Sequence, residues 1–216
     1  MDTEAARQQM IDQQVRAWEV LDPRVLAVLG DVPRERFVPA AFRELAFMDA
    51  PIALPGGQAM LPPSIHGRIL QAVDVAAGET VLEVGTGSGY LAACLSALGA
   101  QVTSLELRPE LAALSAANLA ATGHTDVNVV ETDATTWQPA EHYDVVVITA
   151  SLPDYDRRYE SWLKTGGRLF VVVGDTAPMT ALLVRRAGEQ DFGRTELFET
   201  VIDPLTHAHR PSGFVF

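Results

Sequence analysis

Residues 81–90 read VLEVGTGSGY and residues 103–107 read TSLEL, and these two stretches decide the fold of the chain. The apolar run at 81–84 predicts a buried parallel strand. Three glycines follow it and let the backbone approach a ligand, and the apolar residues 90–98 predict a helix. Free backbone N–H groups at the start of that helix favour an anionic ligand group. The order of strand, glycine loop and helix therefore indicates a nucleotide-binding βαβ unit.

The glycine spacing discriminates between nucleotide cofactors. Folds that bind NAD or flavin prefer G-x-G-x-x-G, whereas this loop reads G-x-G-x-G with Tyr90 in the sixth position. Glu106 ends the next strand 21 positions after Gly85, where such folds place an acid for ribose hydroxyls. Residues 83–89, E-x-G-x-G-x-G, resemble the first motif of the Rossmann-like methyltransferases, which favours S-adenosylmethionine as the cofactor. A nicotinamide oxidoreductase and a glycine turn without a ligand are the alternatives.

Composition is that of a single globular domain. The 216 residues are 48% hydrophobic, enough to bury one sizeable core. A net charge of −12 without clustered Lys or Arg argues against a nucleic-acid partner. The single cysteine, Cys94, has no intrachain partner and is expected to fill the core. Because the N-terminus lacks a signal-peptide pattern and no long apolar stretch occurs, we expect a cytoplasmic protein without a membrane partner.

The first third of the chain has helical and irregular parts. Residues 3–20 have helical spacing with Asp2 or Thr3 as N-cap, and a second helix is expected after Asp22-Pro23. Six prolines punctuate residues 33–63, which predicts an irregular segment that acts as a lid or a brace. We therefore expect residues 1–63 to form N-terminal helices and a substrate-side segment.

Helical and strand patterns alternate from residue 64 onward. Alternation of this kind predicts a parallel sheet with helices on both faces. The β-rich runs 180–188 and 194–203 predict an antiparallel hairpin at the edge of that sheet. The expected fold is α/β: a doubly wound, mostly parallel, Rossmann-like methyltransferase core at 64–216 within one compact domain. Its elements are helices at 64–75, 90–98, 109–122 and 155–164 and strands at 80–84, 101–106, 127–131, 143–149 and 167–174.

Four strand ends are expected to hold the ligand, because open α/β sheets bind outside the carboxyl ends of their strands. Glu106 is suited to accept hydrogen bonds from ribose hydroxyls, Asp133 from an adenine amino group, and the loop amides would meet the methionine carboxylate. The residues expected to bind S-adenosylmethionine are Glu83, Gly85, Thr86, Gly87, Ser88, Gly89, Tyr90, Glu106, Leu107, Asp133, Ala134 and Thr149.

Methyl transfer from a sulfonium needs little acid–base chemistry. Holding the two reactants together supplies roughly 7–11 kcal/mol of the barrier. A carboxylate acceptor is already ionised at neutral pH and needs no general base. This agrees with a chain whose pattern offers no catalytic triad and no metal cluster; turn or surface positions are expected for His124, His142, His207 and His209.

The whole chain resembles the protein-L-isoaspartate O-methyltransferase family. The matching stretches are DPRVLAVLGDVPRERFVP, GGQAMLPPSIHGRIL, VLEVGTGSGYLAA, SLELRPELA, DVVVITASLP, KTGGRLFVVVG and VIDPLTH. The resemblance implies a doubly wound sheet with a modified antiparallel C-terminal part. It also implies methylation of isoaspartyl carboxylates in damaged proteins with S-adenosylmethionine, which begins their repair to normal aspartate.

One loop departs from the family pattern. The family typically reads G-Q-T-I-S-Q-P with an active-site serine, whereas residues 57–63 read GQAMLPP, so Leu61 occupies the serine position and Pro62 replaces glutamine. The resemblance places the catalytic positions at Leu61, Gln58 and, from matches elsewhere, His66 and Thr206. The apolar loop favours an alternative in which the enzyme methylates a less polar acceptor, protein or small molecule. A non-catalytic, cofactor-binding paralogue is a further alternative, and the oligomeric state stays open, a monomer included.

Overall fold

The computed structural model describes residues 3–210, and its chain starts with helices that pack on the later core. Helix α1 (Thr3–Met10) continues through a π turn, η1 (Ile11–Val15), and a 3-10 turn, η2 (Arg16–Trp18). Helix α2 (Pro23–Asp31) begins after Asp22, whose side chain accepts from the Arg24 N–H at 2.8 Å. The proline at the first helical position is the one that the sequence predicts, and the cap by Asp22 is of a common type. The expected N-cap at Asp2 lies outside the described residues.

The proline-rich segment is irregular, as its sequence predicts. It contains 3-10 turns η3 (Arg34–Arg36), η4 (Ala40–Leu45) and η5 (Pro55–Gly57) and the two-residue strands β1 (Ile52–Ala53) and β2 (Ala59–Met60). The two strands pair antiparallel, which holds the intervening turn in place. Prolines lack the N–H that a longer helix or strand would need, so only short pieces form.

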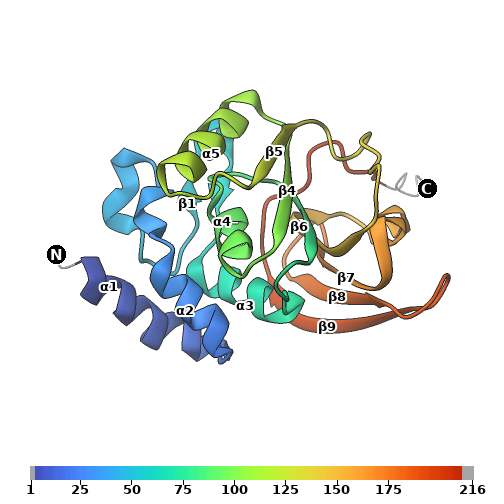
Figure 1. Cartoon of the computed structure of the whole chain (residues 1–216), viewed down its shortest axis with the longest axis horizontal. Coiled ribbons are helices and arrows are strands. Elements are labelled where there is room, and N and C mark those ends of the chain that lie inside the picture. Colours follow the sequence, from blue (N-terminus) through green and yellow to red (C-terminus); the bar gives the residue numbers. More distant parts are fainter. Residues whose placement is uncertain (1–2, 211–216) are drawn as a thin grey trace.

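A seven-stranded mixed sheet forms the centre of the molecule (Figure 1). Its spatial order is β5-β4-β3-β6-β7-β8-β9, with β7–β8 and β8–β9 antiparallel and the other pairs parallel. The expected α/β fold with an antiparallel C-terminal hairpin is confirmed. The strand order reverses between β3 and β6, which is where such sheets bind ligands. The strands are β3 (Thr80–Val84), β4 (Gln101–Glu106), β5 (Asn128–Glu131), β6 (Tyr143–Leu152), β7 (Leu163–Val173), β8 (Met179–Arg186) and β9 (Phe192–Thr200).

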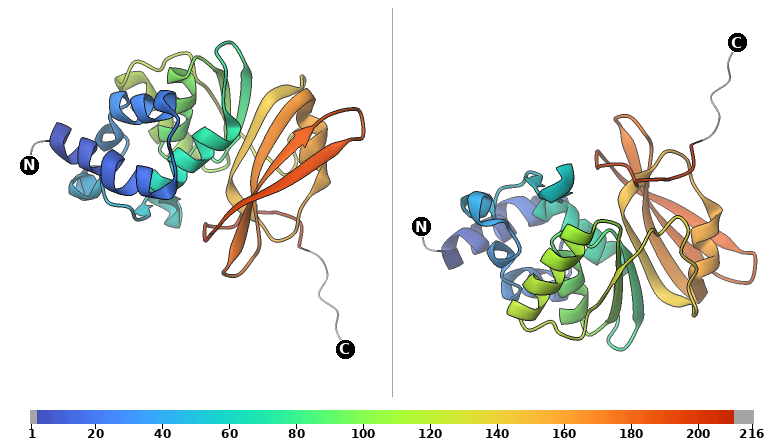
Figure 2. Two further views of the ribbon diagram at one scale, coloured as in Figure 1. Left: turned by 90° about the horizontal axis from the view of Figure 1, so that it is seen from below. Right: turned by 90° about the horizontal axis from the view of Figure 1, so that it is seen from above.

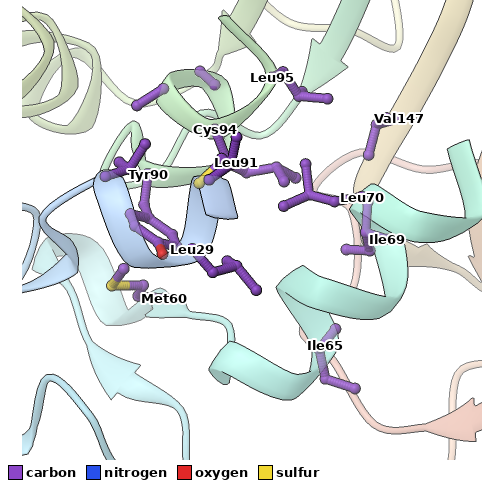
Figure 3. Close-up of a cluster of buried hydrophobic side chains, with 14 of the residues drawn as sticks. Leu29, Met60, Ile65, Ile69, Leu70, Tyr90, Leu91, Cys94, Leu95 and Val147 are labelled. Carbon is purple, nitrogen blue, oxygen red and sulfur yellow. The ribbon is translucent and has the colours of Figure 1, made fainter. Parts of the chain in front are cut away.

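The α-helices gather on one side of the sheet (Figure 2). The remaining helices are α3 (Pro63–Val73), α4 (Tyr90–Ala97) and α5 (Pro109–Ala121). Buried side chains from all five α-helices belong to one apolar cluster with Val145 and Val147 of β6. In Figure 3, Leu91 and Cys94 of α4 lie in this cluster with Leu70 of α3. Cys94 is a fully buried free thiol, which confirms its expected place in the core.

The opposite face of the sheet departs from the sequence prediction. Residues 155–164 were expected to form an α-helix, but the structure has a 3-10 turn, η6 (Arg157–Trp162), and β7 already begins at Leu163. Because β6 ends at Leu152, the connection is too short for a full helical crossover. The buried rings of Tyr159 and Trp162 cover the sheet here instead. Within residues 3–210, no helix is long and apolar enough to cross a membrane.

Candidate active site

A cavity of about 330 Å³ opens at the carboxyl ends of β3, β4 and β6. Two separate parts of the chain close it from the other side: residues 51–62 and the segment 201–206 that follows β9. The residues that line it are Pro51, Gln58, Ala59, Leu61, Pro62, Val84, Gly85, Gly87, Leu105, Glu106, Leu107, Arg108, Leu111, Thr132, Asp133, Ala134, Thr149, Ala150, Val201, Ile202, Asp203, Pro204, Leu205 and Thr206.

The glycine loop connects β3 to α4 in a conformation that requires glycine. Gly85 has φ +93°, and a Cβ there would lie 2.5 Å from the Thr149 hydroxyl oxygen. That hydroxyl lies 2.9 Å from the carbonyl oxygens of both Val84 and Gly85, so β6 braces the start of the loop. Gly89 has φ +86° and precedes the first residue of α4. The loop backbone is therefore fixed before any ligand binds.

Glu106 holds the loop from the neighbouring strand. Its carboxylate is 5% exposed and accepts from the Gly87 N–H at 2.9 Å and from the Arg108 N–H at 3.0 Å. A carboxylate offers about four acceptor positions, so these bonds leave room for a pair of ribose hydroxyls. Position and remaining capacity both fit the role expected from the sequence.

A buried acid lies behind the loop. Glu83 is 0% exposed and accepts from the Ser104 hydroxyl, which in turn lies 2.6 Å from the Thr86 hydroxyl. Burial raises the pKa of Glu83 to about 8, and the nearby Glu106 charge adds to the rise against the effect of the Ser104 bond. The chain Glu83–Ser104–Thr86 therefore supports the loop from below, and none of these three residues lines the cavity.

Asp133 lies at the far end of the cavity and already has partners. One carboxylate oxygen accepts from the Thr135 N–H at 2.8 Å and from its hydroxyl at 2.7 Å, and the other lies 2.7 Å from Nδ1 of His207. Desolvation raises the pKa of Asp133, but the bonds from Thr135 and His207 outweigh it and hold the pKa below its usual value. Asp133 is thus a fixed, ionised acceptor, as an adenine amino group requires.

The chain after β9 returns to the carboxyl edge of the sheet. Ser151 of β6 donates its N–H to the Asp203 carbonyl at 2.9 Å and accepts from the Leu205 N–H at 2.8 Å. This short parallel bridge places residues 201–206 beside the strand ends. His207, expected at a surface or turn position, is exposed, and its contact with Asp133 links the segment to the cofactor side of the cavity.

The opposite wall carries the loop at residues 57–63, which the sequence predicts to differ from the family pattern. Gln58 and Leu61 both line the cavity. The pairing of β1 with β2 holds the turn η5 that joins these two strands. Arg34, 0% exposed, donates to the Leu61 carbonyl from Nη2 at 2.7 Å and to the Ala46 carbonyl from Nε at 2.8 Å. Its guanidinium therefore fixes the backbone of the wall from inside the protein.

Arg34 also connects this wall to the glycine loop. Its guanidinium carbon lies 5.0 Å from the centre of the Tyr90 ring, and Nη1 lies 3.1 Å from Nδ1 of His66. Within residues 3–210 no carboxylate forms a salt bridge with Arg34, and burial lowers its pKa. A buried cation without a counter-ion is costly unless its N–H groups are satisfied, which the carbonyls and the ring nitrogen achieve.

His66 lies outside the cavity that it was expected to serve. It is 4% exposed, packs edge-on against Tyr90 at 5.1 Å and accepts from Arg34 through Nδ1. Burial, and then the charge of Arg34, lower its pKa well below the usual value. A direct catalytic role for His66 finds no support in this position, because a neutral, enclosed imidazole cannot reach a reactant.

The structure brings most of the expected site residues together. Ten line the cavity: Gln58, Leu61, Gly85, Gly87, Glu106, Leu107, Asp133, Ala134, Thr149 and Thr206. The other six lie behind its walls: Glu83, Thr86, Ser88, Gly89, Tyr90 and His66. Among the residues that the sequence reasoning missed, Arg108 directly follows the matched strand end, and Val201–Leu205 lie in the matched stretch VIDPLTH. Their proximity to landmarks was the available signal.

Comparisons with known proteins agree with this geometry. The family model described as Protein-L-isoaspartate(D-aspartate) O-methyltransferase matches residues 5–210. The chain belongs to this family. The protein-L-isoaspartate O-methyltransferase of Rhodopseudomonas palustris (strain ATCC BAA-98 / CGA009) is 39% identical over 201 residues, 92% of each chain. Protein-L-isoaspartate O-methyltransferase 2 of Pelobacter propionicus is 39% identical over 207 residues, 95% of this chain and 92% of that one.

The fold of the family extends over almost the whole chain. A Plasmodium falciparum protein assigned as a protein-L-isoaspartate O-methyltransferase, solved in complex with S-adenosyl-L-homocysteine, superposes with a TM-score of 0.81. The match covers 95% of this chain and 99% of that chain at 15% identity, so it shows a common fold. Family membership confirms the enzyme class and cofactor expected from the sequence: an S-adenosylmethionine-dependent carboxyl O-methyltransferase. The divergence of the loop at 57–63 stays a prediction.

Proposed function

We propose that this protein methylates the free carboxylate of isoaspartyl residues in damaged polypeptides. The observation that carries the proposal is a single cavity in which the glycine-loop wall faces residues 51–62 and 201–206. S-adenosylmethionine supplies a methyl group on a positively charged sulfur. Glu106, Asp133 and Asp203 outnumber the one lining cation, Arg108, so the lining suits a cationic cofactor.

The lining also suits an acceptor that needs no proton removed. In the described part of the chain no His, Cys or Lys lines the cavity, and Asp133 is engaged by His207. An ionised carboxylate can react when it is held close to the methyl group with water excluded. In this proposal Glu106 and the loop amides orient the cofactor, while Gln58, Leu61 and Thr206 shape the acceptor side.

A second candidate is a methyl acceptor less polar than an isoaspartyl peptide. Leu61 and Pro62 both line the cavity, at positions where the resemblance drawn from the sequence implies a serine and a glutamine. Losing one hydrogen bond to a charged group costs about 1.5–3 kcal/mol, which is roughly 10- to 150-fold in rate if the bond acts only in the transition state. Replacement of several polar groups at once favours a pocket remodelled for another acceptor over the same pocket with lower activity.

Two measurements test these candidates. We expect S-adenosylhomocysteine to raise the melting temperature and NAD to leave it unchanged; no shift with the former would contradict the proposed cofactor site. A methyl-transfer assay then compares an isoaspartyl peptide with its normal aspartyl counterpart. Turnover of the isoaspartyl peptide alone supports the first candidate. The second candidate is supported if the natural chain does not methylate the isoaspartyl peptide and Leu61→Ser does. The two proteins differ only at residue 61, so the loop would be the cause.

We also propose that residues 1–63 act as the substrate-side part and residues 64–216 as the methyltransferase core of one domain. The position of Pro51, Gln58 and Leu61 in the cavity wall supports this division. A cytoplasmic setting stays a prediction that rests on the composition.

A further inference from the structure

A groove of about 540 Å³ lies next to the cavity on its acceptor side. The two hollows share Pro51, Pro62 and Val201, so the groove begins where the cavity opens between residues 51–62 and the chain after β9. A polypeptide whose isoaspartyl residue enters the cavity can continue into the groove, because the two hollows share these lining residues. The groove is therefore placed to contact the residues that flank the isoaspartyl residue.

Among residues 3–210, two carboxylates are the only titratable groups in the lining of the groove. Asp49 is held rigidly, because one of its oxygens accepts from the Ser64 hydroxyl at 2.6 Å and the Ser64 N–H at 3.2 Å. Glu199 is exposed on β9 and forms no salt bridge within the described part of the chain. The buried cation Arg34 attracts Asp49 from behind the groove but does not line it, and Arg68 already contacts Glu19 at 3.3 Å. The groove therefore carries negative charge that its own lining does not neutralise.

Apolar surface lies between and beside these acids. Trp18 is 39% exposed and Val201 is 62% exposed, although both are large hydrophobic residues. Lys and Arg pack their aliphatic stems on such surface while the charged head stays in water or near an acid. An indole ring also attracts a cation at its face. Apolar surface flanked by acids is thus chemically matched to a long cationic side chain.

We propose that this groove binds a Lys or Arg residue flanking the isoaspartyl residue of the substrate, so that the enzyme prefers damaged sites next to basic residues. The inference rests on the proposed function for the placement of the polypeptide. A second copy of this chain, with its charge of −12, would bring acid against acid, and a nucleic acid would bring phosphates against acid. A basic peptide segment is the occupant with complementary charge.

The test measures peptide binding separately from turnover. Protein saturated with S-adenosylhomocysteine is titrated with fluorescent isoaspartyl peptides that carry Lys, norleucine or Glu in turn at each of three positions on either side. Norleucine keeps the apolar stem of Lys and removes the charge. Exposed ion pairs contribute modestly, so we expect Lys to tighten binding about three- to tenfold over norleucine at one or more positions, and Glu to weaken it. The preference for Lys falls at high salt.

Variants distinguish the effect of the groove's two carboxylates from that of the overall charge of the protein. In the double variant Asp49→Asn, Glu199→Gln, the ratio of Lys to norleucine affinities falls towards one. Glu196→Gln removes one exposed charge from the same strand outside the groove and leaves the ratio unchanged. Equal affinities in the natural chain, or a preference that persists in the double variant, would overturn the proposal. Methyl transfer to the norleucine peptide is scored separately, so that its absence counts against the proposed function and not against the groove.

Discussion

One wall of the cavity is made by the ends of β3, β4 and β6, and the opposite wall by residues 51–62 and 201–206. The first wall is held by the parallel pairing of β3 with β4 and β6. Hydrogen bonds between the ends of adjacent strands, such as that of Glu106 with Gly87, add to this pairing. The second wall is held by a few long-range contacts, chiefly those of Arg34 and of Ser151. The cofactor wall is part of the sheet, whereas the acceptor wall is attached to it.

This difference predicts that the two walls can be damaged separately. A change on the sheet side is expected to alter cofactor affinity, and a change on the attached side to alter acceptor turnover. The predictions below test that separation, beginning with the largest expected effect.

Glu106→Ala is expected to remove cofactor affinity. The carboxylate supplies acceptors for ribose and also fixes the Gly87 N–H. Because each hydrogen bond to a charged group contributes about 1.5–3 kcal/mol, affinity for S-adenosylhomocysteine should fall by at least about 100-fold, as measured by calorimetry. Glu106→Gln keeps the shape of the side chain and one acceptor oxygen, so it should lose less affinity for S-adenosylhomocysteine. Unchanged affinity in the alanine variant would remove the ribose assignment.

Arg34→Met is expected to damage the acceptor wall more than the cofactor wall. It frees the carbonyls of Leu61 and Ala46 and should lower kcat/KM for the peptide by about 10- to 100-fold, since each lost charged hydrogen bond is worth about 1.5–3 kcal/mol. Affinity for S-adenosylhomocysteine should fall less than kcat/KM, because Arg34 contacts the cofactor side only through the ring of Tyr90, which does not line the cavity. Arg36→Met, in the same 3-10 turn but exposed, serves as the control. An equal loss in cofactor affinity would contradict the separation of the walls.

The cofactor wall was more predictable from sequence than the acceptor wall. Strand runs, the glycine loop and Glu106 follow local periodicity and fixed spacing, so their positions could be inferred. Nothing local in VPRER indicates that Arg34 reaches Leu61, 27 residues later. The return of residues 201–206 to β6 and the 3-10 turn at η6 likewise depend on tertiary packing and connection length. Long-range contacts of single side chains leave no periodic pattern to detect.

Glu83→Gln is expected to change the pH dependence of stability. The folded pKa of about 8 lies above the ordinary glutamate pKa of 4.5, so the unfolded chain loses its proton first and folding stability falls as pH rises from 4.5 to about 8. The slope is at most about 1.4 kcal/mol per pH unit. Gln stays neutral, so the variant should gain stability over the natural chain across this window in urea titrations. Glu131→Gln, on the exposed end of β5, is the control. Parallel curves for Glu83→Gln and the natural chain would argue against a protonated Glu83.

His66→Asn is expected to have the smallest effect on stability. This effect should appear as pH falls, whereas that of Glu83→Gln appears as pH rises. Burial and Arg34 depress the folded pKa of His66, so stability is present above pH 6.5 and is lost as pH falls, when only the unfolded chain takes up the proton. Asn keeps an acceptor for Arg34 and does not titrate. The variant should therefore lose less stability than the natural chain between pH 6.5 and 5, with exposed His142→Asn as the control. A steeper acid-side loss in His66→Asn would contradict the neutral imidazole.

The parallel bridge between Ser151 and Pro204 has a consequence for the order of synthesis. Residues 81–150, which supply the strands and most of the loops of the cofactor wall, leave the ribosome well before Val201 emerges. Until that moment the nascent chain lacks one side of the acceptor wall. The enzyme is therefore expected to become competent to hold a damaged polypeptide only after residues 201–206 have been synthesised and have paired with Ser151, when the site for its cofactor has already had time to fold.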